Sequence, residues 1–287
     1  MKVGLIGLGR WGKNHKRVLK ELGVLHATCD HNVDESDYAE FREMLPEVDA
    51  VTICTPTDTH YEIAKYCLEQ GKHVFVEKPI SESSDQIREL CKIAQDKKLM
   101  FMGGMIYRFN PVVNKLKELW PTFENVHTFT TRYIHPMGPR KDSGAIINLG
   151  IHMIDTINHI TNCPQLSVMC GADNHKDEKM AMLTFFHQGF YSTIEVNCIH
   201  PEKVRDMYII GDDLKVYADL LNQALIINGE TINIEKNNPL KDELSYFIMG
   251  CENKSEVDEP LIKDYERASL ACLCARYSYN EGELLRI

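Results

Sequence analysis

Short apolar runs alternate with longer amphipathic segments in the N-terminal part of the chain. The apolar runs predict strands at residues 2–6, 26–29, 49–54, 73–76 and 99–102. The segments between them predict helices at residues 11–22 and 36–45, a third ending at Gln70 and a fourth following Ser83. Strands separated by helices of this length indicate a parallel sheet with right-handed crossover connections.

The pattern changes after Trp120 and Pro121, where long β-like runs become dominant. These runs predict strands at residues 126–134, 166–170, 180–186, 190–197, 205–210 and 214–217, and one helix interrupts them at residues 145–160. Asn228-Gly229, between two further apolar runs, is a strong hairpin signal. We therefore predict an α/β protein with two domains: a Rossmann domain with a parallel sheet over residues 1–119, and an α+β domain with an open, largely antiparallel sheet over residues 120–287. The C-terminal helix of the second domain is free to pack back on the first.

The first predicted strand runs into a glycine-rich turn, Gly7-Leu8-Gly9-Arg10-Trp11-Gly12. Gly7 permits a sharp turn, Gly9 lets a pyrophosphate approach the backbone, and Gly12 lets the next helix pack on the strand. The N-terminus of that helix offers N–H groups and a partial positive charge to phosphates. A strand, this turn and a helix in this order predict a dinucleotide site formed by Gly7, Gly9, Arg10, Trp11 and Gly12.

Asp30 ends the second predicted strand. A carboxylate at this place can accept hydrogen bonds from both ribose hydroxyls and repels a 2′-phosphate. We therefore expect NAD as the cofactor. NADP is the less favoured alternative. It stays open because His31, next to Asp30, leaves room for doubt about a 2′-phosphate.

Composition excludes several classes of function. The 287 residues carry a formal net charge of −10, whereas a general nucleic-acid binder needs a basic surface. No stretch approaches the roughly 20 apolar residues of a membrane span, and the first residues lack the pattern of a signal peptide. The ten cysteines show no C-x-x-C spacing, so we expect reduced thiols and no metal site. We predict a cytoplasmic protein that binds neither nucleic acid nor membranes.

Separated motifs occur along the chain in a characteristic order. They are the glycine-rich turn, Thr55 to His60 followed by Gly71 to Pro79, Tyr107 to Pro111, and Gly144 with Asn148 to Asp155. Together they resemble the Gfo/Idh/MocA oxidoreductases, which include glucose-fructose oxidoreductase and inositol dehydrogenase. The resemblance covers nearly the whole chain. It implies an N-terminal Rossmann domain that binds NAD near Thr55, Thr57 and His60, and a C-terminal open-sheet domain that often forms the interface of a homo-oligomer, either a dimer or a tetramer.

Lys78 follows the strand at residues 73–76, at the end where ligands bind in open α/β sheets. A Lys largely desolvated beside a nicotinamide would have its pKa lowered towards a useful range. Glu77 could pair with the nicotinamide amide or a ribose hydroxyl, and Pro79 stiffens the loop. We predict that Lys78 has a catalytic role and also contacts the cofactor.

His152 is the second catalytic candidate. Asn148, His152 and Asp155 share one face of the predicted helix, which forms either a polar cleft lining or a solvent face. The resemblance places the family's catalytic His on His152, and an imidazole titrates near physiological pH. The family commonly has an Asp where this chain has Asn148, and Asn can bind a sugar hydroxyl but cannot take a proton. We therefore predict that His152 is the main acid/base and that Lys78 orients and polarises the reacting oxygen.

Several polar residues are candidates for substrate binding. They are Tyr107, Arg108, Asn148, Arg140 and Lys141. Arg108 either contacts a ligand or braces its loop. Arg140 and Lys141, in a Gly/Pro-containing loop, could hold an anionic part of the substrate.

The resemblance implies a substrate among sugars, cyclitols and nucleotide sugars. The opening segment, from Gly9 to Leu19, is similar to members that oxidise the 3-hydroxyl of UDP-N-acetylhexosamines. We rank a nucleotide sugar first, with Arg108, Arg132, Arg140 and Lys141 available for its diphosphate, and a free sugar or inositol second. A catalytically silent NAD-sensing regulator is the alternative from another class.

Overall fold

The structure is a computed structural model that describes residues 1–32, 34–81, 83–136, 138, 143–173, 178–253 and 259–287. The chain divides into two units, the first made of Met1–Ile106 and Asn238–Glu266, the second of Tyr107–Asn237 and Arg267–Ile287. The predicted boundary lay at residues 119 and 120, so the division differs in two ways. Helix α5 (Pro111–Leu119) belongs to the second unit because it packs on α6 (Ile151–Thr161), and α7 (Pro239–Glu252) returns to the first unit because it packs on α1 (Arg10–Glu21).

The first unit is built on a five-stranded sheet in the order β2-β1-β3-β4-β5, in which every neighbouring pair is parallel. Its strands are β1 (Val3–Ile6), β2 (Leu25–Cys29), β3 (Ala50–Ile53), β4 (His73–Val76) and β5 (Phe101–Gly103). The central strands are buried along their length, as expected for a parallel sheet covered on both faces. The predicted Rossmann domain is confirmed.

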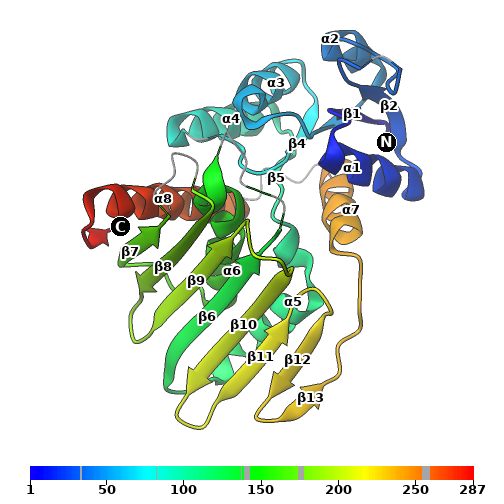
Figure 1. The fold of residues 1–287 in the computed structure, drawn as a ribbon. Coiled ribbons are helices and arrows are strands. Elements are labelled where there is room, and N and C mark those ends of the chain that lie inside the picture. Colours follow the sequence, from blue (N-terminus) through cyan, green and yellow to red (C-terminus); the bar gives the residue numbers. More distant parts are fainter. Residues whose placement is uncertain (33, 82, 137, 139–142, 174–177, 254–258) are drawn as a thin grey trace. The chain divides into compact units, whose positions relative to one another are not determined.

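Helices cover this sheet in two pairs (Figure 1). α1 packs on α7, and α3 (Thr57–Glu69) packs on α4 (Ser84–Lys97). The Ser83 hydroxyl accepts a hydrogen bond from the Gln86 N–H and caps α4. Within the same unit, the Glu243 carboxylate of α7 accepts a hydrogen bond of 2.6 Å from the Met105 N–H and so ties α7 to the segment after β5.

The helix predicted at residues 36–45 is wrong over its first half. Only α2 (Phe41–Met44) and a 3-10 turn, η1 (Leu45–Glu47), are helical. Both the N–H and the hydroxyl of Thr28 donate to the Asp37 carboxylate at 2.8 Å, and Tyr38 forms a parallel bridge with Cys29. These contacts hold the segment beside β2 in a non-helical conformation of turns and bends, and the sequence pattern gave no sign of them.

The second unit is built on a nine-stranded sheet in the order β13-β12-β11-β10-β6-β9-β8-β7-β14. Neighbouring strands are antiparallel except β6 and β9. The predicted open, largely antiparallel sheet is therefore confirmed. The strands are β6 (Val126–Ile134), β7 (Ser167–Ala172), β8 (Met180–Phe186), β9 (Tyr191–Asn197), β10 (Val204–Gly211), β11 (Lys215–Asp219), β12 (Ala224–Ile227), β13 (Glu230–Ile232) and β14 (Leu285–Arg286).

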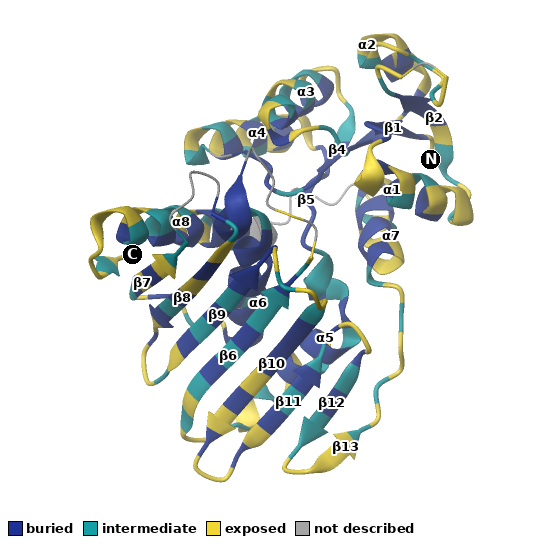
Figure 2. Ribbon diagram, viewed as in Figure 1, coloured by how far each residue is buried: buried dark blue, intermediate teal, exposed yellow. Residues whose placement is uncertain are grey.

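Buried and exposed residues alternate along these strands, as Figure 2 shows. α5, α6 and the later part of α8 (Glu259–Glu281) lie on one face of the sheet (Figure 1). Short helical turns, η2 (Ile106–Phe109), η3 (Trp120–Thr122) and the π-helical η4 (Ile146–Gly150), lead into the other elements. Asn228 and Gly229 both have positive φ, 50° and 86°, which the predicted hairpin between β12 and β13 requires. No helix of the described residues is long and apolar enough to cross a membrane.

Candidate active site

The glycine-rich turn of the first unit leaves room for a ligand at one glycine and none at the others. A Cβ on Gly7 would lie 2.8 Å from the backbone of Cys54, and its φ of 93° itself favours glycine. A Cβ on Gly12 would lie 2.0 Å from the Gly7 carbonyl oxygen. Above Gly9, by contrast, no described atom lies within 4 Å of such a Cβ. The turn therefore fits a dinucleotide, whose pyrophosphate needs this open approach.

Helix α1 begins directly at this turn. Within the described residues, no side chain caps its N-terminus and its first turn holds no acidic residue. Its first N–H groups thus keep their capacity to bind phosphate oxygens. Arg10 and Trp11, both exposed, are the first two residues of the helix.

The Asp30 carboxylate is tied to the same turn. Its Oδ2 accepts a hydrogen bond of 2.5 Å from the Leu8 N–H, and its Oδ1 accepts one of 3.0 Å from the Asn32 N–H. Burial raises the pKa of Asp30, but the two N–H donors, with His31 and Lys13, outweigh burial and lower the pKa below its usual value. Asp30 is therefore charged at neutral pH, as NAD selection requires.

His60 joins two loops at the carboxyl ends of the strands. Its Nδ1 lies 2.7 Å from the Pro79 carbonyl oxygen and its Nε2 lies 2.9 Å from the Thr55 carbonyl oxygen. The side chain is 1% exposed. These contacts give His60 a packing role at the start of α3, next to the loops where the resemblance places NAD. Thr57 is also buried, while Thr55 is half-buried.

Glu77 is held by protein groups on both carboxylate oxygens. Oε1 accepts a hydrogen bond from Trp11 Nε1 and lies 2.9 Å from His15 Nε2, while Oε2 lies 3.2 Å from the Lys78 backbone nitrogen. Burial raises the pKa of Glu77, but His15, Trp11 and Lys78 outweigh it and lower the pKa below its usual value. A Cβ on Gly104 would lie 3.2 Å from both oxygens, so the glycine makes room for this carboxylate.

Lys78 lies directly after Glu77, beyond the carboxyl end of β4, and its side chain is half-buried. The next peptide bond, to Pro79, is cis. The Ile80 N–H donates a hydrogen bond of 2.5 Å to the hydroxyl of Tyr265, a buried residue of α8. The loop that carries Lys78 is thus held by contacts of Glu77, of Ile80 and of the Pro79 carbonyl oxygen, which His60 contacts.

In the second unit, two tyrosine rings frame His152 on α6. The Tyr133 ring of β6 stacks on the imidazole, with centroids 5.5 Å apart and an interplanar angle of 8°. The Tyr107 ring of η2 meets it edge-on at 5.4 Å and 77°. His152 is 6% exposed. The solvent-face alternative for this side of the helix is therefore wrong, because His152 and Asp155 are both buried.

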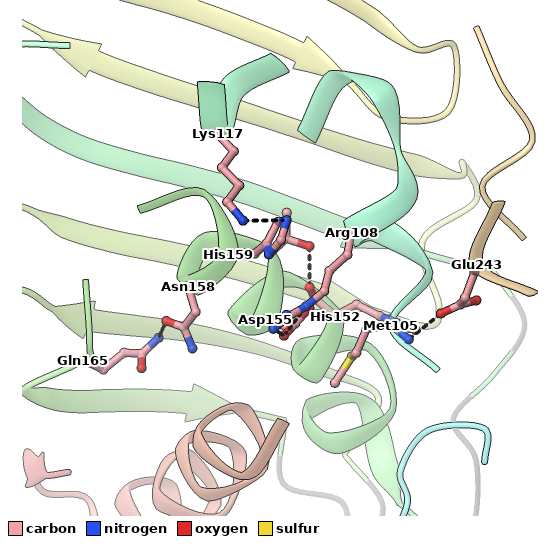
Figure 3. A network of polar contacts seen from close by, with 10 residues as sticks. Met105, Arg108, Lys117, His152, Asp155, Asn158, His159, Gln165 and Glu243 are labelled. Atoms are coloured by element: carbon pink, nitrogen blue, oxygen red, sulfur yellow. Dashed lines mark hydrogen bonds and ion pairs between the residues drawn. The ribbon is translucent and has the colours of Figure 1, made fainter. Parts of the chain in front are cut away.

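Arg108 forms a buried pair with Asp155, one turn of α6 beyond His152, as Figure 3 shows. The guanidinium Nε donates to Oδ2 at 2.9 Å and Nη2 donates to Oδ1 at 2.5 Å. Arg108 is 7% exposed. Of the two roles considered for Arg108, this bidentate pair favours bracing.

The start of the His152 helix is anchored by Glu178. Its carbonyl oxygen accepts from the Ala145 N–H at 2.8 Å, and its carboxylate accepts from the Ile146 N–H at 3.1 Å. Gly144, with a φ of 61°, leaves room for this carboxylate, because a Cβ there would lie 2.4 Å from it. Asn148 lies in η4, where the π-helical turn replaces the regular α-helix that was predicted, and is half-buried.

Of the four cations considered for a diphosphate, two have a carboxylate partner and two lie outside the described residues. Arg132 is paired with the Asp206 carboxylate on the neighbouring strand. Arg108 is paired with Asp155. Arg140 and Lys141 lie outside the described residues. No group of three or more His, Cys, Asp or Glu among the described residues is arranged to hold a metal ion.

Sequence reasoning missed Tyr133 and Arg205. Both point to the helix-covered face of the sheet, where they are register partners on β6 and β10. The available signal was the position of Arg205, a charged residue in step with the apolar Met207 and Ile209.

Comparison with known proteins agrees with this geometry. Residues 1–105 match the model of the Gfo/Idh/MocA oxidoreductase family, described as an NAD-binding Rossmann fold. Residues 1–105 are a Gfo/Idh/MocA domain. The predicted family resemblance, the enzyme class and the NAD cofactor are confirmed at this level.

Individual relatives cover more of the chain than the Gfo/Idh/MocA domain. UDP-N-acetylglucosamine 3-dehydrogenase from Acidithiobacillus ferrooxidans is 26% identical over 277 residues, which is 86% of this chain and 88% of that protein. Myo-inositol 2-dehydrogenase from Thermotoga maritima is 30% identical over 182 residues, 56% of this chain and 54% of that protein.

Solved structures share the fold. The structure of the Acidithiobacillus ferrooxidans enzyme aligns with a TM-score of 0.88 at 24% identity and covers 98% of both chains. GenD2 from gentamicin A biosynthesis, solved in complex with NAD, aligns with a TM-score of 0.86 at 18% identity, covering 100% of this chain and 96% of that chain.

Proposed function

We propose that this protein is an NAD-dependent dehydrogenase that transfers a hydride between the nicotinamide and a secondary hydroxyl of a sugar. A nucleotide sugar ranks first, with the 3-hydroxyl of a UDP-N-acetylhexosamine as the reacting group. The observation that carries the proposal is the match to UDP-N-acetylglucosamine 3-dehydrogenase over most of both chains. The charged Asp30 at the open glycine turn supports NAD as the cofactor.

Oxidising a secondary alcohol requires a hydride acceptor and a base for the hydroxyl proton. Bound NAD supplies the hydride acceptor. The imidazole of His152 takes the hydroxyl proton, and in the reverse direction the imidazolium returns it to the carbonyl oxygen. Lys78 orients and polarises the reacting oxygen with its ammonium group. Asn148 contributes a hydrogen bond to a sugar hydroxyl but cannot hold the proton.

A free sugar or inositol is the second candidate substrate. The similarity to myo-inositol 2-dehydrogenase supports it. The ion pairs of Arg108 and Arg132 also support it, because a cation that already has a carboxylate partner is less suited to bind a diphosphate. A free polyol carries no charge and needs no cation.

The test is reduction of NAD, followed by the absorbance of the reduced nicotinamide, with UDP-N-acetylglucosamine, UDP-N-acetylgalactosamine, free hexoses and myo-inositol. We expect the highest kcat/KM with a UDP-N-acetylhexosamine. A signal with a free polyol alone would keep the dehydrogenase and replace the substrate. Binding of NAD without turnover on any of these compounds would contradict the proposal and favour the regulator.

A further inference from the structure

Arg205 occupies a position where an apolar residue would fit the pattern of its strand. Arg205 shares the helix-covered face of β10 with Met207 and Ile209, and it is 2% exposed. Burying a guanidinium costs several kcal/mol unless its donors are satisfied. A buried Arg at such a place therefore calls for a specific role.

The partners of Arg205 satisfy its donors without neutralising its charge. Nη1 donates to the carbonyl oxygens of Ile134 and Val204, and Nη2 donates to His135 Nδ1 at 2.9 Å. Nε donates to the Tyr107 hydroxyl at 3.1 Å. Among the described residues no carboxylate forms an ion pair with Arg205.

The fifth contact is with an aromatic face. The guanidinium carbon lies 3.1 Å from the centroid of the Tyr133 ring, a cation–π contact between register partners on β10 and β6. Arg205 therefore holds Tyr133 by its face and Tyr107 by its hydroxyl. These two rings are the ones that frame His152.

The chemistry of the guanidinium suits this double contact. Its planar fork donates in several directions while its face stacks on a ring, which a Lys ammonium cannot do. Burial raises the pKa of Tyr107 well above its usual value, so the hydroxyl keeps its proton while it accepts from Nε. One residue, Arg205, therefore contacts both rings that frame His152.

We propose that Arg205 is a positioning residue that holds the imidazole of His152 in its working orientation by fixing the rings of Tyr107 and Tyr133. The inference rests on the proposed role of His152 as the acid/base. It assigns Arg205 no contact with the substrate. Loss of the fork lets both rings tilt, and a misplacement of the base by about 1 Å lowers the rate on the order of 100-fold.

The test compares Arg205→Lys with the native protein on whichever substrate proves active. We expect kcat to fall about 100-fold, with KM and the NAD dissociation constant changed less than threefold, roughly the scatter of a peripheral change. Arg286→Lys, an exposed arginine of the same unit, is the matched control and should retain native kcat. The coupling is measured with Tyr133→Leu, because Arg205→Lys should cost little further kcat once the ring is absent.

Failure of the inference can be told from failure of the proposed function. If His152→Asn is inactive while Arg205→Lys keeps native kcat, only the inference is overturned. If His152→Asn keeps native kcat, the role of His152 is overturned first. Should Arg205→Lys fail to fold, Tyr107→Phe removes only the hydroxyl that Arg205 holds; a lower kcat at unchanged KM supports the inference, and a native kcat contradicts it.

Discussion

Among single residues, Asp30 carries the proposed preference for NAD. Its carboxylate binds the Leu8 N–H of the glycine turn and the Asn32 N–H of its own loop. These donors outweigh burial and lower the pKa of Asp30. Its negative charge is therefore fully present above about pH 3.9, the ordinary pKa of an aspartate, and is lost only as the pH falls through the lower pKa of the folded protein. The charge that the proposed preference for NAD requires is therefore present at physiological pH.

Replacing Asp30 with Asn should relax the preference for NAD. The amide keeps one acceptor for the Leu8 N–H but carries no charge to repel a 2′-phosphate. We expect the ratio of NADP to NAD affinity, measured by calorimetry, to rise about tenfold, or ~1.4 kcal/mol. Asp34→Asn removes the same charge from an exposed position in the same loop and should leave the ratio unchanged. A ratio equal to the native one in Asp30→Asn would contradict the role of the carboxylate.

Among the helices, strands and turns, the elements predicted best from the sequence are those that depend on the conformational preferences of their own residues. The turn at Gly7 and the hairpin at Asn228-Gly229 each depend on backbone conformations that the residue types themselves favour. The non-helical segment at Asp37 depends instead on contacts with Thr28 in another element. No periodicity within the segment records that contact, so the predicted helix at residues 36–45 was too long.

The candidate site divides in the same way. Lys78 and His152 were predicted because motifs carry them, and helical spacing placed Asp155 on the same face as His152 without a role of its own. The frame of Tyr133 and Arg205 was not predicted, because it depends on the register of β6 against β10 across a long stretch of sequence. Register is set by the packing of the whole sheet. The sequence signal for this frame was Arg205, a charged residue at a position where the strand pattern has apolar ones.

At the scale of the whole molecule, the nine-stranded sheet leaves one face without helices. Exposed and buried residues alternate along β7, β8, β9 and β10 (Figure 2), and several of the exposed ones are large and apolar. They are Met169, Met182, Phe186, Tyr191, Tyr208 and Ile210. Polar residues such as Thr128 and Thr130 of β6 lie between them, and a sheet face of this mixed kind, without covering helices, suits a protein–protein interface. We propose that this face joins copies of the chain into a dimer or tetramer.

A charge on this face should dissociate the oligomer. Met182 is 49% exposed in the middle of β8, so Met182→Glu would place a carboxylate in the dry centre of the interface, where burial is costly. We expect light scattering at micromolar concentration to give an oligomer for the native chain and a monomer for the variant. Leu221→Glu, at an exposed site outside the strands, should stay oligomeric. A monomeric native chain would contradict the proposal.

The activity of His152→Asn tests the proposed mechanism most sharply. An acid/base of this kind contributes on the order of 100-fold or more to the rate, so kcat should fall by at least that factor. The NAD dissociation constant should stay near the native value, because His152 lies outside residues 1–105, the part of the chain that matches the NAD-binding family model. His127→Asn, an exposed histidine of the same unit, should keep native kcat. Loss of turnover with NAD binding retained is the predicted result, and near-native turnover in His152→Asn would contradict the proposed mechanism.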